Sequence, residues 1–135
     1  MTTVRTLLAT AALACAAATT AAADLNINNR GDDKKFIANL TTDLIKTARG
    51  SPKDVAYVEH AADDKVKDRL KWTIKGSYKG SLTGKQFESD IVVVIDTANA
   101  KKWEVLTIEY ADNNKTAPAG PSKANVEKLR ATLNK

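Results

Sequence analysis

Residues 68–79 read Asp-Arg-Leu-Lys-Trp-Thr-Ile-Lys-Gly-Ser-Tyr-Lys, and this stretch decides the fold. Apolar and polar side chains alternate along it, which is the period of a β-strand with one buried face. Gly76 interrupts the apolar face, and a glycine there predicts a bend, a bulge or a close crossing by a helix. The buried face is expected to carry Leu70, Trp72, Ile74 and Tyr78.

Three more segments with strand character flank this one along the chain, at residues 55–62, 85–96 and 103–112. The connections at residues 80–84 and 97–102 are short. A parallel pairing would need a longer crossover, so the four strands are predicted to form an antiparallel meander.

A helix is predicted before the strands, over residues 32–49, where apolar residues recur at helical spacing. Asp32 and Asp33 suit the positive end of the helix dipole, and Gly50 can take the left-handed conformation that ends a helix. A shorter helix is predicted at residues 122–134. The predicted fold class is therefore α+β: an N-terminal helix packed on a four-stranded antiparallel meander, followed by a C-terminal helix.

The first 23 residues have the order of a secretory signal. Arg5 precedes a charge-free run built mainly of Ala, Leu and Thr, and residues 21–23 supply the small side chains that a signal peptidase accepts. We expect cleavage after Ala23, with residues 16–18 as the nearest rival site. Residues 24–135 then form a single small α+β domain without a transmembrane span, and the protein is predicted to be exported, either periplasmic or secreted.

Cys15 is the only cysteine, and it lies within this segment. Residues 12–15, Ala-Leu-Ala-Cys, partly match a bacterial lipoprotein box, so lipidation of Cys15 is the alternative to simple cleavage. Once the segment is removed, the domain has no thiol and can hold neither a disulfide nor a thiolate–metal site.

The charge balance argues against a nucleic-acid partner. The chain carries 21 basic and 16 acidic residues, a formal net charge of +5. Removal of Arg5 leaves 20 against 16, or +4. Proteins that bind nucleic acid through its phosphates usually show a much larger basic excess.

No motif predicts catalysis or a cofactor. Residues 80–85, Gly-Ser-Leu-Thr-Gly-Lys, lack the spacing, the following Ser or Thr and the helix of a phosphate-binding loop. His60 is the only histidine, and no nucleophile-elbow motif accompanies it. We therefore predict no catalytic residue, no metal site and no cofactor, and a protein that is not an enzyme.

The hairpin of the third and fourth strands has apolar residues on both faces. Residues 91–95 are consecutive Ile and Val, and Trp103 and Val105 fall opposite the other apolar residues of their strand. A strand that is covered on both sides has this pattern. Either the C-terminal helix or the lead segment covers the second face, or an exposed apolar patch serves a partner or a homodimer. That patch would consist of Val92, Val94, Trp103 and Val105.

Charge is unevenly distributed along the strands. Residues 65–85 carry seven basic side chains against Asp68, a balance of +6, and residues 86–114 carry six acidic against two basic, a balance of −4. Adjacent antiparallel strands of opposite charge can pair across the ladder. The alternative is an anion-facing strip for lipid headgroups, an acidic polysaccharide or an acidic protein, formed by Lys71, Lys75 and Lys79.

These observations predict an exported, non-enzymatic interaction module of the cell envelope or exterior. It would use Lys71, Lys75 and Lys79 for anion contact and Trp103 and Val105 as an apolar anchor. The alternative is a carrier of a lipid or small hydrophobic ligand, with a pocket between the first helix and the sheet. That pocket would be lined by Phe36, Leu40, Trp72, Ile74 and Tyr78.

Overall fold

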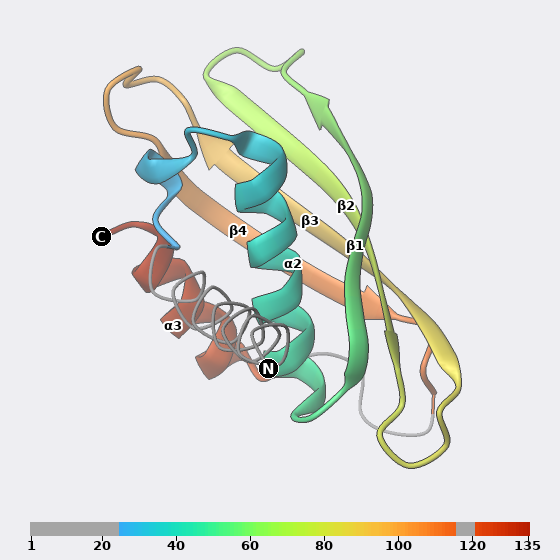
Figure 1. Cartoon of the computed structure of the whole chain (residues 1–135). Helices are drawn as coiled ribbons and strands as arrows, with labels where there is room; N and C mark the ends of the chain where they lie inside the picture. The colour runs from blue at the N-terminus through green and yellow to red at the C-terminus, as the bar shows by residue number, and fades with distance from the viewer. Residues whose placement is uncertain (1–24, 116–120) are drawn as a thin grey trace, which may run out of the picture.

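The computed structural model describes residues 25–115 and 121–135. A short 3-10 turn, η1 (Ile27–Asn29), precedes a long helix, α2 (Asp33–Arg49). Four strands and a second helix follow: β1 (Lys53–Asp63), β2 (Arg69–Lys79), β3 (Gln86–Asp96), β4 (Glu104–Asp112) and α3 (Lys123–Leu133). This is the predicted order of elements, and the α+β fold class is confirmed (Figure 1).

The strands form one antiparallel sheet in the order β1-β2-β3-β4, which confirms the predicted meander. β2 and β3 pair without a register shift, from Arg69 opposite Asp96 to Lys79 opposite Gln86. Figure 1 shows α2 lying across one face of this sheet, with α3 beside β4. We call the face that carries α2 the inner face and the opposite one the outer face.

α2 begins and ends at residues whose chemistry suits those positions. The side chain of Asp32 accepts a hydrogen bond from the backbone N–H of Lys35 and so caps the first turn. Gly50 follows the last turn with a φ of 74°, and its N–H donates to the carbonyl of Lys46. The buried residues of the helix are Phe36, Ile37, Leu40, Thr41, Leu44 and Ile45.

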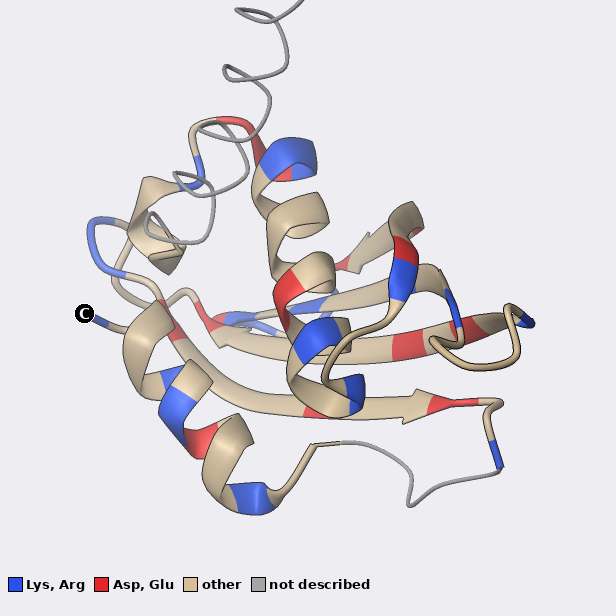
Figure 2. Cartoon of the chain, turned by 60° about the horizontal axis from the view of Figure 1, so that its bottom comes forward, with Lys and Arg blue, Asp and Glu red and all other residues tan. Residues whose placement is uncertain are grey.

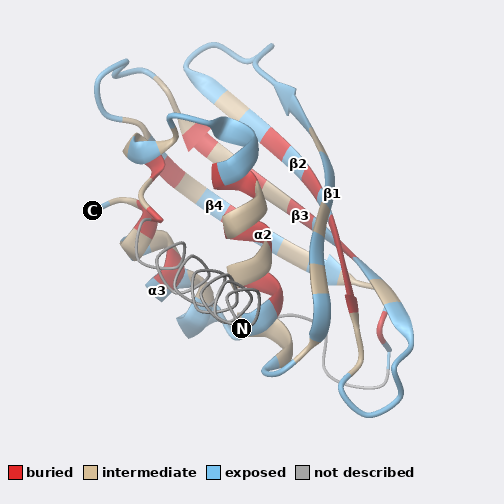
Figure 3. Cartoon of the chain, in the orientation of Figure 1, coloured by how far each residue is buried: buried red, intermediate tan, exposed pale blue. Residues whose placement is uncertain are grey.

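One hydrophobic core lies between the inner face and the helices. Leu25 and Ile27, ahead of α2, belong to this core, and so do Leu129 and Leu133 of α3. Figure 3 shows the buried segments, in red, concentrated on α2, the central strands and β4. The lead segment and the end of the chain therefore cover Trp103 and Val105, as one predicted alternative expects, whereas Val92 and Val94 of the same predicted patch remain outside the core.

Gly76 marks a close crossing of α2 over β2. A Cβ atom on this residue would lie 2.6 Å from Thr41 Cγ2 and 2.9 Å from Ile45 Cδ1. The pairing of β1 with β2 also shifts register between Tyr57 and Glu59, directly after the Tyr57–Gly76 pair. The predicted helix crossing and a bulge in the neighbouring strand therefore occur together at this glycine.

β4 contains an irregularity that the sequence does not reveal. Val94 pairs with Thr107 and Ile95 with Val105, so Leu106 is an extra residue between the two pairs. An extra residue reverses the inside–outside alternation on one side of it. Val105 consequently faces the core with 0% exposure, and its predicted place in an exposed apolar patch is wrong.

Two asparagine side chains close part of the free edge of β4. The amide of Asn134 accepts a hydrogen bond from the N–H of Val105 at 2.7 Å and donates to its carbonyl at 3.0 Å. The amide of Asn28 bonds the backbone of Trp103 in the same way, at 2.9 and 3.3 Å. These amides occupy backbone groups that a further strand would need.

The predicted signal segment, with Cys15 and the expected first residue Asp24, lies outside the described residues. Within the part of the chain that is described, no helix combines the length and apolar character needed to cross a membrane.

Candidate functional site

The outer face of the sheet is a surface that neither α2 nor α3 covers (Figure 1). Val92 and Val94 of β3 lie half-buried on it, outside the core. The strand register places Thr73 of β2 beside Val92 and Thr107 of β4 beside Val94. We call these four β-branched residues, Thr73, Val92, Val94 and Thr107, the outer patch.

The lysines predicted to contact anions lie on β2, and the strand register or an ion pair relates each of them to an acidic residue. Lys75 pairs across the strands with Glu59 on one side and Asp90 on the other. Lys71 pairs with Asp63 in the same way. The third, Lys79, has its Nζ 3.2 Å from a carboxylate oxygen of Asp54.

Opposite charges are therefore interleaved over the outer face. Arg69, at the start of β2, forms an ion pair with Asp96 of β3 at 3.3 Å. Figure 2 shows basic and acidic segments side by side on neighbouring strands. Exposed cross-strand pairs of this kind contribute at most about 1 kcal/mol each. The register favours cross-strand pairing as the role of these lysines over a strip that binds a polyanion.

Trp103 and Val105, the predicted apolar anchor, do not share a surface. Val105 lies in the core, whereas Trp103 is half-buried. The guanidinium carbon of Arg30 lies 3.2 Å from the centroid of the Trp103 ring, a cation–π contact that covers the indole. Of the four residues predicted for the apolar patch, Val92 and Val94 are the two on the outer face.

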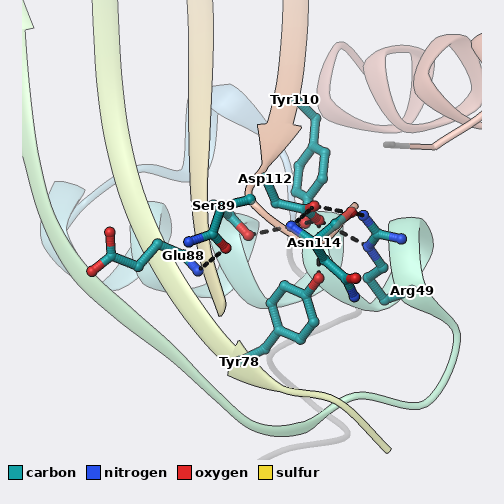
Figure 4. Close-up of polar contacts among 8 residues, drawn as sticks. Arg49, Tyr78, Glu88, Ser89, Tyr110, Asp112 and Asn114 are labelled. Atoms are coloured by element: carbon teal, nitrogen blue, oxygen red, sulfur yellow. Dashed lines mark hydrogen bonds and ion pairs between the residues drawn. The ribbon is translucent and has the colours of Figure 1, made fainter. Parts of the chain in front are cut away.

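Side chains from α2, β2, β3 and β4 meet around the carboxylate of Asp112 (Figure 4). Arg49, at the end of α2, donates to both carboxylate oxygens, at 2.8 and 2.5 Å. The hydroxyls of Tyr78 and Tyr110 donate to Oδ2 at 3.1 and 2.9 Å. The backbone N–H of Asn114 donates to Oδ1 at 3.0 Å. Ser89 of β3 extends this Asp112 network through a 2.9 Å contact with the Tyr110 hydroxyl.

The Asp112 network is shielded from solvent. The side chains of Asp112 and Arg49 are 0% and 7% exposed. Burial alone would raise the pKa of the Asp112 carboxyl, but hydrogen bonds from Arg49, Tyr110, the Asn114 backbone and Tyr78 outweigh it, so the pKa lies below its ordinary value. Burial is also the main cause that raises the pKa of Tyr78 and of Tyr110.

These shifts keep the network in one protonation state around neutral pH. A general acid or base needs a pKa near the working pH, and here the carboxyl and both hydroxyls are shifted away from it. The arrangement instead ties the end of α2 to three strands. Sequence reasoning missed it because Arg49 and Asp112 are 63 residues apart and neither stands in a recognisable motif.

His60 lies beside an open hollow at the start of α2. Its Nδ1 is 2.6 Å from the hydroxyl of Tyr57. The described residues that line the hollow are Asn28, Arg30, Gly31, Asp32, Asp33, Lys34 and His60, and none of these is a serine or a cysteine. Among residues 25–115 and 121–135, no group of three or more His, Cys, Asp or Glu side chains is placed to hold a metal ion.

The five residues predicted to line a ligand pocket all lie buried between α2 and the sheet. Their exposed fractions run from 0% for Leu40 and Ile74 to 6% for Phe36. The rings of Phe36 and Trp72 are tilted against each other with centroids 6.2 Å apart. Side chains in mutual contact fill this layer, as in an ordinary protein core.

No protein-family model matches the chain, and neither the curated proteins nor the solved structures include a match to it.

Proposed function

We propose that this protein is an exported, non-enzymatic binding module that engages a partner protein through the outer patch. The observation that carries the proposal is a β-branched surface, centred on Val92 and Val94, that the described helices leave uncovered. Charged residues border it: Lys71 lies beside Val94, Glu109 beside Val92, and the Lys75–Asp90 pair follows along the strands.

A weakly polar centre with a charged rim is the usual anatomy of a protein interface. The rim of the outer patch contains charges of both signs, on Lys71, Lys75, Asp90 and Glu109. A protein that presents both signs can complement such a rim. Lipid headgroups and acidic polysaccharides would need an excess of cations, which this face does not have.

Export is supported by the signal-like order of residues 1–23, with Arg5 ahead of a charge-free run. The partner is therefore expected in the cell envelope or outside the cell. A carrier function is supported less well, because Phe36 and Trp72 pack against each other where a ligand would have to lie. Native mass spectrometry of the purified protein checks this alternative, since a carrier would retain a hydrophobic ligand mass.

A photoreactive amino acid placed at Thr107 tests the outer patch in living cells. We expect a cross-linked protein at this position and none when the same group replaces Lys46, an exposed residue of α2. The variant Val94→Glu places a charge in the centre of the patch and should remove the Thr107 product without unfolding the domain. Absence of a product at Thr107, or an unchanged amount of it in Val94→Glu, contradicts the proposal.

A further inference from the structure

We propose a second binding site at the free edge of β1, which accepts an extended segment carrying two basic side chains four residues apart. It is formed by residues 59–63, which we call the acidic edge. This site uses the backbone of a strand edge, whereas the outer patch is a sheet face. The two sites are distinct surfaces, although Glu59 and Asp63 pair across the strands with Lys75 and Lys71 at the rim of the outer patch.

The two edge strands of the sheet differ in whether side chains already bond their free backbone groups. On β4, Asn28 and Asn134 already bond the backbones of Trp103 and Val105. β1 is paired with β2 on one side, and no described strand lies on its other side. Every second residue of such an edge strand directs its N–H and C=O away from the sheet. Figure 3 shows β1 exposed over most of its length.

The acidic edge is the regular part of β1. Residues 59–63 pair one-to-one with residues 75–71, whereas register shifts interrupt the strand between Lys53 and Ala56 and between Tyr57 and Glu59. Ala61 and Ala62 are exposed and small, which leaves the backbone accessible to another chain. Regular, accessible backbone is what an added strand requires.

Charge alternates from strand to strand across the outer face as far as the acidic edge. Asp90 on β3 pairs with Lys75 on β2, and Lys75 pairs with Glu59 on β1. A further strand that continued the alternation would carry basic side chains opposite Glu59 and Asp63. Glu59 and Asp63 lie on one face of the strand and are four residues apart, so the matching cations are also four apart.

A second copy of this chain is a poorer occupant than such a segment. If two acidic edges paired antiparallel about Ala61, Glu59 of each copy would lie directly opposite Asp63 of the other. Like charges at directly opposed positions destabilise a strand pair. Charged side chains on an edge are one of the devices by which proteins prevent self-pairing. The acidic edge therefore selects against its own copy and for a basic strand.

The hollow at the start of α2 lies next to the same part of β1. His60 lines it from the strand, and Asp32 and Asp33 line it from the helix side. Because side chains alternate along a strand, the residue that an added segment places opposite His60 would point toward the inner side, where the hollow is open.

Two synthetic peptides test the acidic edge on the isotope-labelled full chain. One is Thr-Lys-Val-Thr-Val-Lys-Thr, and the other has glutamate in place of both lysines. We expect amide chemical shifts to change at residues 59–63, with the lysine peptide bound about three to ten times more tightly than the glutamate peptide. The variant Glu59→Lys/Asp63→Lys should reverse this preference. The matched control Glu88→Lys/Glu104→Lys, with the same change of charge on the exposed residues of β3 and β4, should keep it.

Equal binding of the two peptides, or no shift at residues 59–63 with the lysine peptide, overturns the proposal. If the reversed variant fails to fold, the comparison of the two peptides on the unaltered chain still decides. Protection of residues 59–63 that rises with protein concentration, without any peptide, would identify a second copy as the occupant and would also overturn it. Cross-linking at Thr107 reports separately on the outer patch, so failure of one site is distinguishable from failure of the other.

Discussion

The carboxylate of Asp112 shows how one buried charge can join distant parts of a small domain. Arg49 reaches it from α2, and two tyrosine hydroxyls reach it from β2 and β4. Removing one partner of a buried ion pair costs more than the intact pair contributes, because the remaining charge is left uncompensated away from water. In Arg49, whose side chain is 7% exposed, the guanidinium would lose the carboxylate that accepts two of its hydrogen bonds.

Asp112→Asn keeps the size of the side chain but removes its charge. We expect the free energy of unfolding to fall by about 3 kcal/mol, measured by urea denaturation. Asp54→Asn is the matched control, because Asp54 forms an exposed ion pair with Lys79, and its effect should stay below about 1 kcal/mol. Equal effects of the two substitutions would mean that the Asp112 network does not hold α2 to the sheet.

The free energy of unfolding should depend on pH in a way that reflects the lowered pKa of the Asp112 carboxyl. The pKa of Asp112 is lowered in the folded state, so below about pH 4 the unfolded chain binds a proton that the folded chain does not. The stabilisation is therefore present above the unfolded pKa and is lost as the pH falls through the folded pKa. Urea denaturation from about pH 6 downward should show the wild-type advantage over Asp112→Asn shrinking below about pH 4. A constant difference would contradict the lowered pKa.

Substitutions of Lys75 and Lys71, both on β2, should lower the free energy of unfolding by different amounts. Lys75 has a carboxylate on each side, from Glu59 and Asp90, whereas Lys71 has only Asp63 as an acidic pairing partner. We expect Lys75→Glu to lower the free energy of unfolding by about 1 kcal/mol and Lys71→Glu by about half of that. The double variant Lys75→Glu/Glu59→Lys should recover part of the loss in thermal unfolding. A larger effect at Lys71 would rule out cross-strand pairing as the dominant role of these side chains.

At the level of the elements, local spacing was enough to predict most of the fold. The helix expected at residues 32–49 is α2 (Asp33–Arg49), and the strand expected at residues 68–79 is β2 (Arg69–Lys79). The strand expected at residues 55–62 is longer in the structure, Lys53–Asp63. As an edge strand with two register shifts, β1 has no fully buried residue and therefore a weak alternation.

The features that sequence reasoning missed depend on partners far away along the chain. The side chain of Val105 faces the core because of the register of β4 against β3, and no glycine marks the extra residue Leu106. The amide of Asn134 meets the backbone of Val105 across 29 residues. Such long-range contacts produce no periodic pattern in the sequence. The candidate surface in the structure is therefore the outer patch, in place of the predicted Trp103 and Val105.

Gly76 sets how closely α2 can approach β2. Gly76→Ala would push a methyl group against Thr41 and Ile45, and we expect a loss of about 1–3 kcal/mol in urea denaturation. Thr41→Ser removes the nearer contact, Cγ2, and retains a hydroxyl that can still donate to the carbonyl of Ile37. The double variant Gly76→Ala/Thr41→Ser should therefore be more stable than additivity of the two single changes implies. Strict additivity would show that the crossing of α2 does not limit this position.

At the level of the whole molecule, the described elements that cover the sheet lie on its inner side. α2, α3 and the lead segment fill the inner face, and Asn28 and Asn134 bond the backbone at the β4 edge. Neither helix covers the outer face, and no described strand pairs with the free edge of β1. If both proposed sites bind as predicted, one partner would lie on a face of the sheet and the other along its edge.

If the protein is exported and cleaved after Ala23, the mature chain should begin at Asp24 and retain the described core residues. Leu25 and Ile27 are 4% and 0% exposed, so cleavage after Ala23 preserves both, whereas cleavage after Ile27 would remove two core side chains. Mass spectrometry of the exported protein should give the mass of residues 24–135, and Cys15→Ser should leave it unchanged. Ala23→Glu should block this cut, because a signal peptidase requires a small residue there. A lipid-modified Cys15 at the N-terminus, lost in Cys15→Ser, would contradict cleavage after Ala23 and anchor the module to a membrane surface.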